Sequence, residues 1–197
     1  MKPLITVALF GIALLFPSIS SAAACCAAPV AAPTNTLPAD SVYQLDAVWT
    51  NAAGRAVALT ELRGPQRIVA MFYASCTYAC PMLVADLKKI AARLPPGSDV
   101  VFTLFSFDPE RDSPANLSAF AERQGIAGSK WVLMTSGPEQ VRELAAVLGV
   151  RYRKDTDGSI AHSNPITLLD GDGRIGVQLP GLNEDPTALL EALTATP

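Results

Sequence analysis

The chain has a single histidine among its 197 residues, which excludes any site that needs two imidazoles from one chain. It also lacks a run of lysine or arginine, and its 15 basic residues are outnumbered by 18 acidic ones. A basic patch is the electrostatic footprint of nucleic-acid binding, so we expect no nucleic-acid partner. Only 17% of the residues are charged, but 50% are hydrophobic, which is enough to build the core of one domain.

No hydrophobic run near the amino terminus is long enough to span a membrane. The apolar stretch Leu4–Phe16 is shorter than the about 20 residues that a spanning helix needs. It follows Lys2 and precedes the small residues Ala22–Ala24, a pattern typical of a secretory signal peptide. We therefore predict that residues 1–24 are a signal peptide, cleaved before Cys25, and that the mature protein is exported to the periplasm.

The predicted new amino terminus leaves two alternatives open, a free chain and a membrane tether through a lipidated Cys25. Residues 25–40 are rich in alanine and proline and carry one charge, which favours a tether over a folded segment. Dense patterning begins at Ser41. We assign residues 41–197 to one domain.

Strand-like and helix-like segments alternate in this domain. Ile68–Tyr73 and 100–107 are continuous apolar runs of strand length, typical of strands buried on both faces. The other expected elements are a hairpin over 42–49 and 56–59, helices over 81–94, 114–124, 138–148 and 185–193, and strands over 131–134, 166–169 and 174–179. Strands separated by helices of about 10–15 residues predict an α/β fold with a mixed, mostly parallel central sheet covered on both faces.

Two cysteines, Cys76 and Cys80, stand between an expected strand and an expected helix. Pro81 disfavours helical backbone at Cys80, so the helix is expected to begin at Pro81 and both cysteines to lie in the loop before it. Free N–H groups at a helix amino terminus stabilise thiolates, which serve either disulfide exchange or soft-metal binding. The three-residue spacer favours a metal, while a redox-active pair and a structural disulfide remain alternatives.

The lone histidine, His162, precedes the strand expected at Ile166. Functional groups converge on such loops in α/β proteins, although a single histidine is more often an ordinary packed or surface residue. Two thiolates and one imidazole suit a three-coordinate copper site, whereas Zn²⁺ would require a fourth donor that is not evident. His162 is therefore a candidate copper ligand beside the cysteine pair.

The segment Asp108–Pro114 carries three carboxylates and an arginine within five residues. One interpretation is a self-paired surface turn that caps the next helix. The alternative is an acidic cluster that positions the metal-binding loop or docks a partner.

These motifs, in this order, resemble the Sco/SenC family of copper-binding thioredoxin-like proteins over about residues 40–195. The resemblance rests on a strand running into Cys76-x-x-x-Cys80-Pro81, the segment from Asp108, and His162-Ser163 ahead of a strand. It implies a thioredoxin-like three-layer sandwich with an inserted hairpin. It also implies one copper, Cu(I) or Cu(II), held by Cys76, Cys80 and His162.

The resemblance further implies a metallochaperone, a binding protein rather than an enzyme. Its partner would be the copper-site subunit of a respiratory oxidase, or another copper carrier, and it would deliver copper or reduce the thiols of that site. The alternative is a thiol-disulfide oxidoreductase in which Cys76 attacks, Cys80 resolves the mixed disulfide and His162 is dispensable. A peroxidase supported by Thr77 and Arg111 is a weaker third hypothesis.

Overall fold

The computed structural model describes residues 36–156 and 158–195. The predicted signal peptide, Cys25 and all of the predicted tether before residue 36 lie outside the described residues, so these predictions stay untested. Within the described ranges, no helix is both long and apolar enough to cross a membrane.

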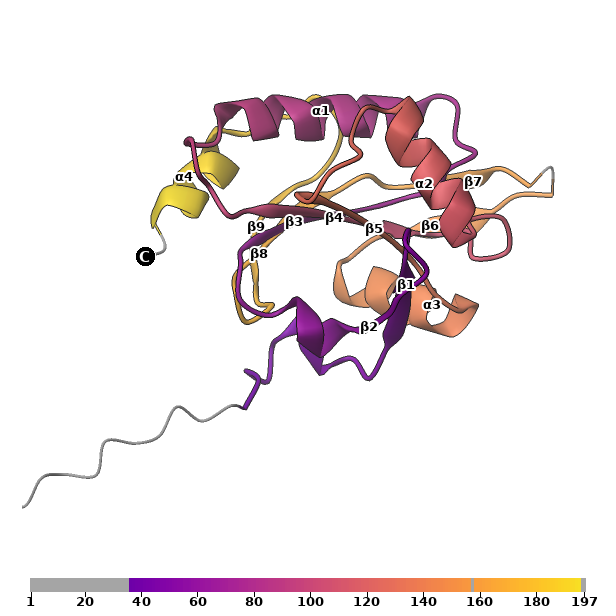
Figure 1. The fold of residues 1–197 in the computed structure, drawn as a ribbon, viewed down its shortest axis with the longest axis horizontal. Coiled ribbons are helices and arrows are strands. Elements are labelled where there is room, and N and C mark those ends of the chain that lie inside the picture. Colours follow the sequence, from indigo (N-terminus) through magenta and orange to yellow (C-terminus); the bar gives the residue numbers. More distant parts are fainter. Residues whose placement is uncertain (1–35, 157, 196–197) are drawn as a thin grey trace, which may run out of the picture. The chain divides into compact units, whose positions relative to one another are not determined.

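A seven-stranded sheet runs through the middle of the domain in the order β2-β1-β5-β4-β3-β8-β9 (Figure 1). Its strands are β1 (Val48–Asn51), β2 (Ala56–Ala58), β3 (Arg67–Phe72), β4 (Val101–Ser106), β5 (Trp131–Thr135), β8 (Ile166–Leu169) and β9 (Ile175–Leu179). The predicted amino-terminal hairpin is confirmed as the antiparallel pair β1–β2, although residues Val42–Gln44 form a short 3₁₀ helix, η1, instead of extending it.

The expectation of a mostly parallel sheet was wrong. Only β3–β4 and β4–β5 pair in parallel, while β1–β2, β1–β5, β3–β8 and β8–β9 are antiparallel. The helices that follow β3 and β4 return the chain to the same end of the sheet, which makes their successors parallel. The short turns inside β1–β2 and β8–β9 reverse the chain instead, so antiparallel strands flank the parallel centre.

Helices cover both faces of the sheet, which confirms the predicted three-layer α/β sandwich. Figure 1 shows α1 (Ala79–Arg93), α2 (Pro114–Arg123) and α4 (Thr187–Ala195) on one face and α3 (Pro138–Val147) on the other. Strand β3 is buried along its whole length because its residues alternate between two cores. Ile68, Ala70 and Phe72 pack beneath α1, α2 and α4, whereas Val69 and Met71 pack with α3, η1 and a second 3₁₀ helix, η2 (Leu59–Leu62).

Helix α1 begins earlier than the sequence suggested. Its first residue is Ala79, so Cys80 lies in the first helical turn, and only Cys76 occupies the loop that was expected to hold both cysteines. A proline in a first turn costs no hydrogen bond, because the first N–H groups of a helix have no intrahelical partner. Pro81 is therefore compatible with a start two residues before it.

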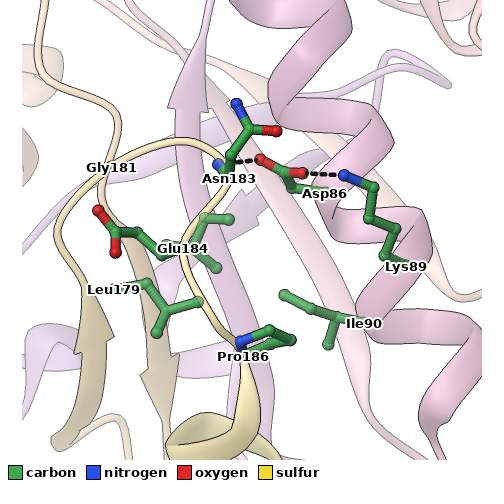
Figure 2. A pocket seen from close by; sticks show the side chains of 9 residues that line it. Asp86, Lys89, Ile90, Leu179, Gly181, Asn183, Glu184 and Pro186 are labelled. Carbon is green, nitrogen blue, oxygen red and sulfur yellow. Dashed lines mark hydrogen bonds and ion pairs between the residues drawn. The ribbon is translucent and has the colours of Figure 1, made fainter.

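The connection between β9 and α4 is fastened to α1 through Asp86 (Figure 2). The Asp86 carboxylate accepts hydrogen bonds from the backbone N–H of Asn183 at 2.7 Å and from Lys89 Nζ at 2.8 Å. These groups line a cavity of about 240 Å³ between the helix and the loop. Because both Asp86 oxygens are engaged, we interpret this cavity as part of the packing of the carboxyl-terminal helix.

A second, two-stranded sheet was missed by the sequence analysis. It pairs β6 (Tyr152–Lys154) with β7 (Ile160–His162) in an antiparallel hairpin. Each strand has three residues and β6 is mostly exposed, so neither shows the alternation that marks a half-buried strand. His162 is consequently the last residue of a strand, directly opposite Tyr152, and not part of a loop.

Candidate metal centre

The loop after β3 folds the two cysteines toward each other. The backbone N–H of Cys76 donates to the carbonyl of Tyr73 at 3.2 Å, which turns the chain immediately before the helix. The backbone N–H of Cys80 then donates to Cys76 Sγ at 3.3 Å. Cys80 is fully buried in the core beneath α1, Cys76 is partly buried, and both are free thiols.

The two thiols have opposite acidities. A hydrogen bond from the Cys80 thiol, aided by the backbone N–H groups of Cys80 and Tyr78, lowers the pKa of Cys76 from 9.0 to about 4. The same hydrogen bond, together with burial, raises the pKa of Cys80. Cys76 is therefore the thiolate of the pair at neutral pH, and Cys80 is its proton-bearing neighbour.

Alkylation of Cys76 should reveal this lowered pKa. Because only the thiolate reacts, an ordinary thiol slows about tenfold for each pH unit below its pKa. In a protein with Cys25 and Cys26 replaced by serine, iodoacetamide should still modify Cys76 at pH 6 almost as fast as at pH 8, with the rate falling only as pH approaches about 4. Mass spectrometry of the modified peptide measures the profile; a midpoint near 9 would contradict the assignment.

One ring nitrogen of His162, Nδ1, is engaged in a hydrogen bond, and none to Nε2 is found among the described residues. Its Nδ1 lies 3.0 Å from the carbonyl oxygen of Ser163, and because a carbonyl only accepts, Nδ1 carries the proton in this contact. In a neutral imidazole with that tautomer the lone pair is on Nε2, the form in which imidazole binds metals. The ring packs 4.8 Å from that of Phe107 and 5.8 Å from that of Tyr73, measured between centroids.

Cys76 and His162 line the same cavity, of about 280 Å³, at the amino terminus of α1. Its walls also include Tyr73, Thr77, Tyr78, Ala79, Ile160 and Ala161. Cys80 does not line this cavity, but its backbone N–H is hydrogen-bonded to Cys76 Sγ. The structure thus brings two of the three predicted site residues, Cys76 and His162, to one cavity and holds the third, Cys80, in contact with Cys76.

The side chains of Cys76, Cys80 and His162 are suitable ligands for a soft metal, but they are not arranged around a common metal position. Among the residues described, no three histidine, cysteine, aspartate or glutamate side chains are grouped closely enough to hold an ion. Two sulfurs and an imidazole nitrogen are nevertheless the ligands that soft metals prefer. Binding would require Cys80 to lose its proton and the hairpin carrying His162 to approach the cysteines.

Sequence reasoning missed Tyr73 as a neighbour of this site. Burial and the adjacent Cys76 raise the pKa of its hydroxyl, which also interacts with the backbone of Ile160 in β7. Tyr73 therefore contacts both the cysteine loop and the hairpin. In the sequence it is only the last residue of an apolar run, and nothing there distinguishes it from a core aromatic.

A three-layer thioredoxin-like domain, in which a cysteine of lowered pKa contacts a second cysteine and shares a cavity with a histidine, is typical of thiol-based metal-binding or redox proteins. A family model described as SCO1/SenC matches residues 39–196. The chain therefore belongs to the SCO1/SenC family, which confirms the resemblance found in the sequence.

Individual relatives agree with this assignment. The chain is 23% identical over 142 residues to the SCO1 protein homolog of Bacillus subtilis (strain 168), covering 70% of this chain and 74% of that protein. It is 25% identical to Arabidopsis thaliana ScoI, solved with copper bound, with a TM-score of 0.63 over 74% of this chain and 92% of that one. A SCO1/SenC family lipoprotein from Bacillus anthracis str. Ames is also 25% identical, with a TM-score of 0.66 over 76% of this chain and 95% of that one.

Proposed function

We propose that this protein binds one copper ion through Cys76, Cys80 and His162 and delivers it to the copper centre of a respiratory oxidase. The observation that supports the proposal is the shared cavity, which is lined by both Cys76 and His162. The copper-bound Arabidopsis relative supports the choice of metal. Copper is here the cargo, so the site must both take it up and release it.

Each proposed ligand has a distinct part in uptake. Cys76 is already a thiolate and is accessible from the cavity, so it offers the first sulfur. Cys80 has to release its proton before its sulfur can bind, and this makes uptake pH-dependent. His162 supplies a neutral nitrogen, with Ser163 fixing the tautomer through Nδ1.

The family and the sequence support a proposal for the place of action and the receiving partner. Membership of the SCO1/SenC family, together with a structural neighbour described as a member of the Sco family of cytochrome c oxidase assembly proteins, supports a role in assembling the oxidase copper centre. The predicted signal peptide and the lipoprotein relative support an extracytoplasmic location, free or tethered at Cys25. The partner proposed is the copper-site subunit of the oxidase or a second copper carrier.

A second candidate function, thiol-disulfide exchange, is favoured by the opposite pKa shifts of Cys76 and Cys80. The Cys76 thiolate would attack a partner disulfide and release one partner thiolate, forming a mixed disulfide. Cys80, after losing its proton, would attack Cys76 Sγ and release the second partner thiolate. The pair would become a disulfide, and its two electrons would reduce the partner.

His162→Ala distinguishes the two functions. In an anaerobic titration of the reduced protein, with Cys25 and Cys26 replaced by serine, we expect one copper per chain in the parent. In the variant we expect an affinity loss of about tenfold or more and an altered absorption spectrum, because a ligand nitrogen is gone. Arg153→Ala is the matched control, since Arg153 lies on the same hairpin, is 78% exposed and does not line the cavity.

The copper-binding and thiol-exchange functions predict different results for this variant. Copper binding that is absent, or that does not change in His162→Ala, would refute the proposed ligand set. Rapid reduction of a model disulfide, unaffected by His162→Ala, would then establish the exchange function instead.

A further inference from the structure

The segment Asp108–Asp112, here called the acidic segment, is self-paired through Asp108 and Arg111, as one interpretation of the sequence suggested, but it is not a surface turn. The side chains of Asp108 and Asp112 are almost fully buried. Backbone N–H groups of Arg111 and Asp112 donate to the Asp108 carbonyl at 3.1 and 2.8 Å, which makes the segment a tight turn after β4. Buried carboxylates persist only where hydrogen bonds or cations compensate for them, so their partners are informative.

One side of the acidic segment holds the cysteine loop. Asp112 Oδ2 accepts the backbone N–H of Ala74 at 3.0 Å and the Ser106 hydroxyl at 2.5 Å. Ala74 is two residues before Cys76, so Asp112 fixes the start of the loop against the end of β4. These contacts are buried or partly buried, where loss of one partner of a charged hydrogen bond is costly.

The other side holds the hairpin that carries His162. Arg111 Nε pairs with Asp108, and Arg111 Nη2 donates to the carbonyl of Gly158 at 2.7 Å, between β6 and β7. Glu110 also accepts a hydrogen bond from Lys154 Nζ at 2.6 Å. The Glu110–Lys154 pair is exposed and contributes little, so Arg111, fixed by the buried Asp108, is the stronger of these two polar connections.

The hairpin depends on such contacts because it belongs to a separate two-stranded sheet. Among the residues that the structure describes, its strands pair with each other and not with the seven-stranded sheet. Backbone hydrogen bonding of the main sheet therefore does not set the separation between β7 and the cysteine loop. Side-chain contacts must set it, and the acidic segment is bonded to both elements.

We propose that the acidic segment is a bracket that sets the position of His162 relative to Cys76 and Cys80, with Arg111 as the positioning residue. The proposal rests on the proposed function, because it assigns the bracket to a copper-binding histidine. Arg111 touches neither the cavity nor the proposed ligands and acts only through the hairpin. Its loss should therefore loosen the hairpin while leaving the cysteine loop in place.

Hydrogen exchange of the metal-free protein tests the bracket independently of copper. In Arg111→Gln, amides of the hairpin 152–162 should exchange about tenfold faster, because one charged hydrogen bond no longer holds them. Amides of the loop 74–78 should be unchanged, since Asp112 still holds Ala74. Arg142→Gln is the matched control: it removes the same charge from an exposed arginine that pairs only weakly with Glu139 on its own helix, α3, and it should leave both regions unchanged.

Copper binding supplies the second readout. Arg111→Gln should weaken copper binding about threefold to tenfold when His162 is present and not at all in the His162→Ala background. Arg111→Lys keeps the charge beside Asp108, but a lysine cannot hydrogen-bond Asp108 and the Gly158 carbonyl at the same time as the guanidinium does. It should therefore recover only part of the lost copper affinity.

Unchanged hairpin exchange in Arg111→Gln would overturn the bracket, even if His162 proves to be a copper ligand. Failure of the parent to bind copper would instead overturn the proposed function, and the exchange result would still stand. If Arg111→Gln accelerates exchange throughout the domain, Arg111→Lys, which keeps the charge beside Asp108, replaces it. A smaller acceleration confined to the hairpin then supports the bracket, and its absence refutes it.

Discussion

Replacing Cys80 with serine is expected to lower the affinity for Cu(I) by about a thousandfold or more. Loss of a residue that merely orients a metal ligand costs about 10- to 100-fold, and Cys80 is proposed as a direct sulfur donor, so its loss should cost more. Serine is close to cysteine in size, so the buried position beneath α1 stays filled. Competition with a Cu(I) chelator under anaerobic conditions measures the change.

A second variant at this position separates metal binding from thiol acidity. The largest contribution to the lowered pKa of Cys76 is the hydrogen bond from the Cys80 side chain. Serine can still donate that hydrogen bond, whereas alanine cannot. Cys80→Ala should therefore raise the pKa of Cys76 toward its ordinary value of 9.0, and Cys80→Ser should leave it low, although both lose copper.

The alkylation profile of Cys76 in the two variants checks this difference. A low pKa of Cys76 that persists in Cys80→Ala would show that the helix amino terminus, not Cys80, stabilises the thiolate. Copper affinity retained in Cys80→Ser would show that Cys80 is not a ligand.

Phe72→Ala is expected to have the largest effect on stability, lowering the free energy of unfolding by about 3–5 kcal/mol. Phe72 is fully buried at the end of β3, and its ring lies 4.8 Å from that of Phe120 on α2. Truncation leaves a cavity between the central strand and a helix packed on it. The loss is a large fraction of the about 5–15 kcal/mol that stabilises a typical domain.

Urea denaturation followed by circular dichroism measures this change. Val147→Ala serves as the control, since Val147 is 41% exposed at the end of α3 and its truncation should change stability by only about 0.5 kcal/mol. A change of similar size in both variants would mean that Phe72 is not a centre of the core.

The sequence predicted the buried centre of the domain well because strong patterns carry local information. The apolar run from Ile68 to Tyr73 was correctly interpreted as a central strand, and Ser113-Pro114 correctly marked the start of α2. The short hairpin Tyr152–His162 could not be found this way. Its strands are held by pairing with each other and by Arg111, and neither contact leaves a periodic pattern.

The candidate metal centre, too, was only partly predictable from the sequence. Cys76, Cys80 and His162 were recognisable as candidates because their side chains are rare and chemically distinctive in this chain. The differing acidity of the two cysteines was not, since it depends on the direction of one hydrogen bond and on the burial of Cys80 within the first turn of α1.

The sequence alone therefore determined the fold class, the family and the residue types available for chemistry, because hydrophobic periodicity and motif order are written along the chain. Tertiary structure alone decided the pairing of the flanking strands, the cavity shared by Cys76 and His162, and the partners of the buried carboxylates Asp108 and Asp112. The reason is physical: pairing, burial and hydrogen bonding join residues far apart in the chain, and local patterns do not record which distant groups will meet.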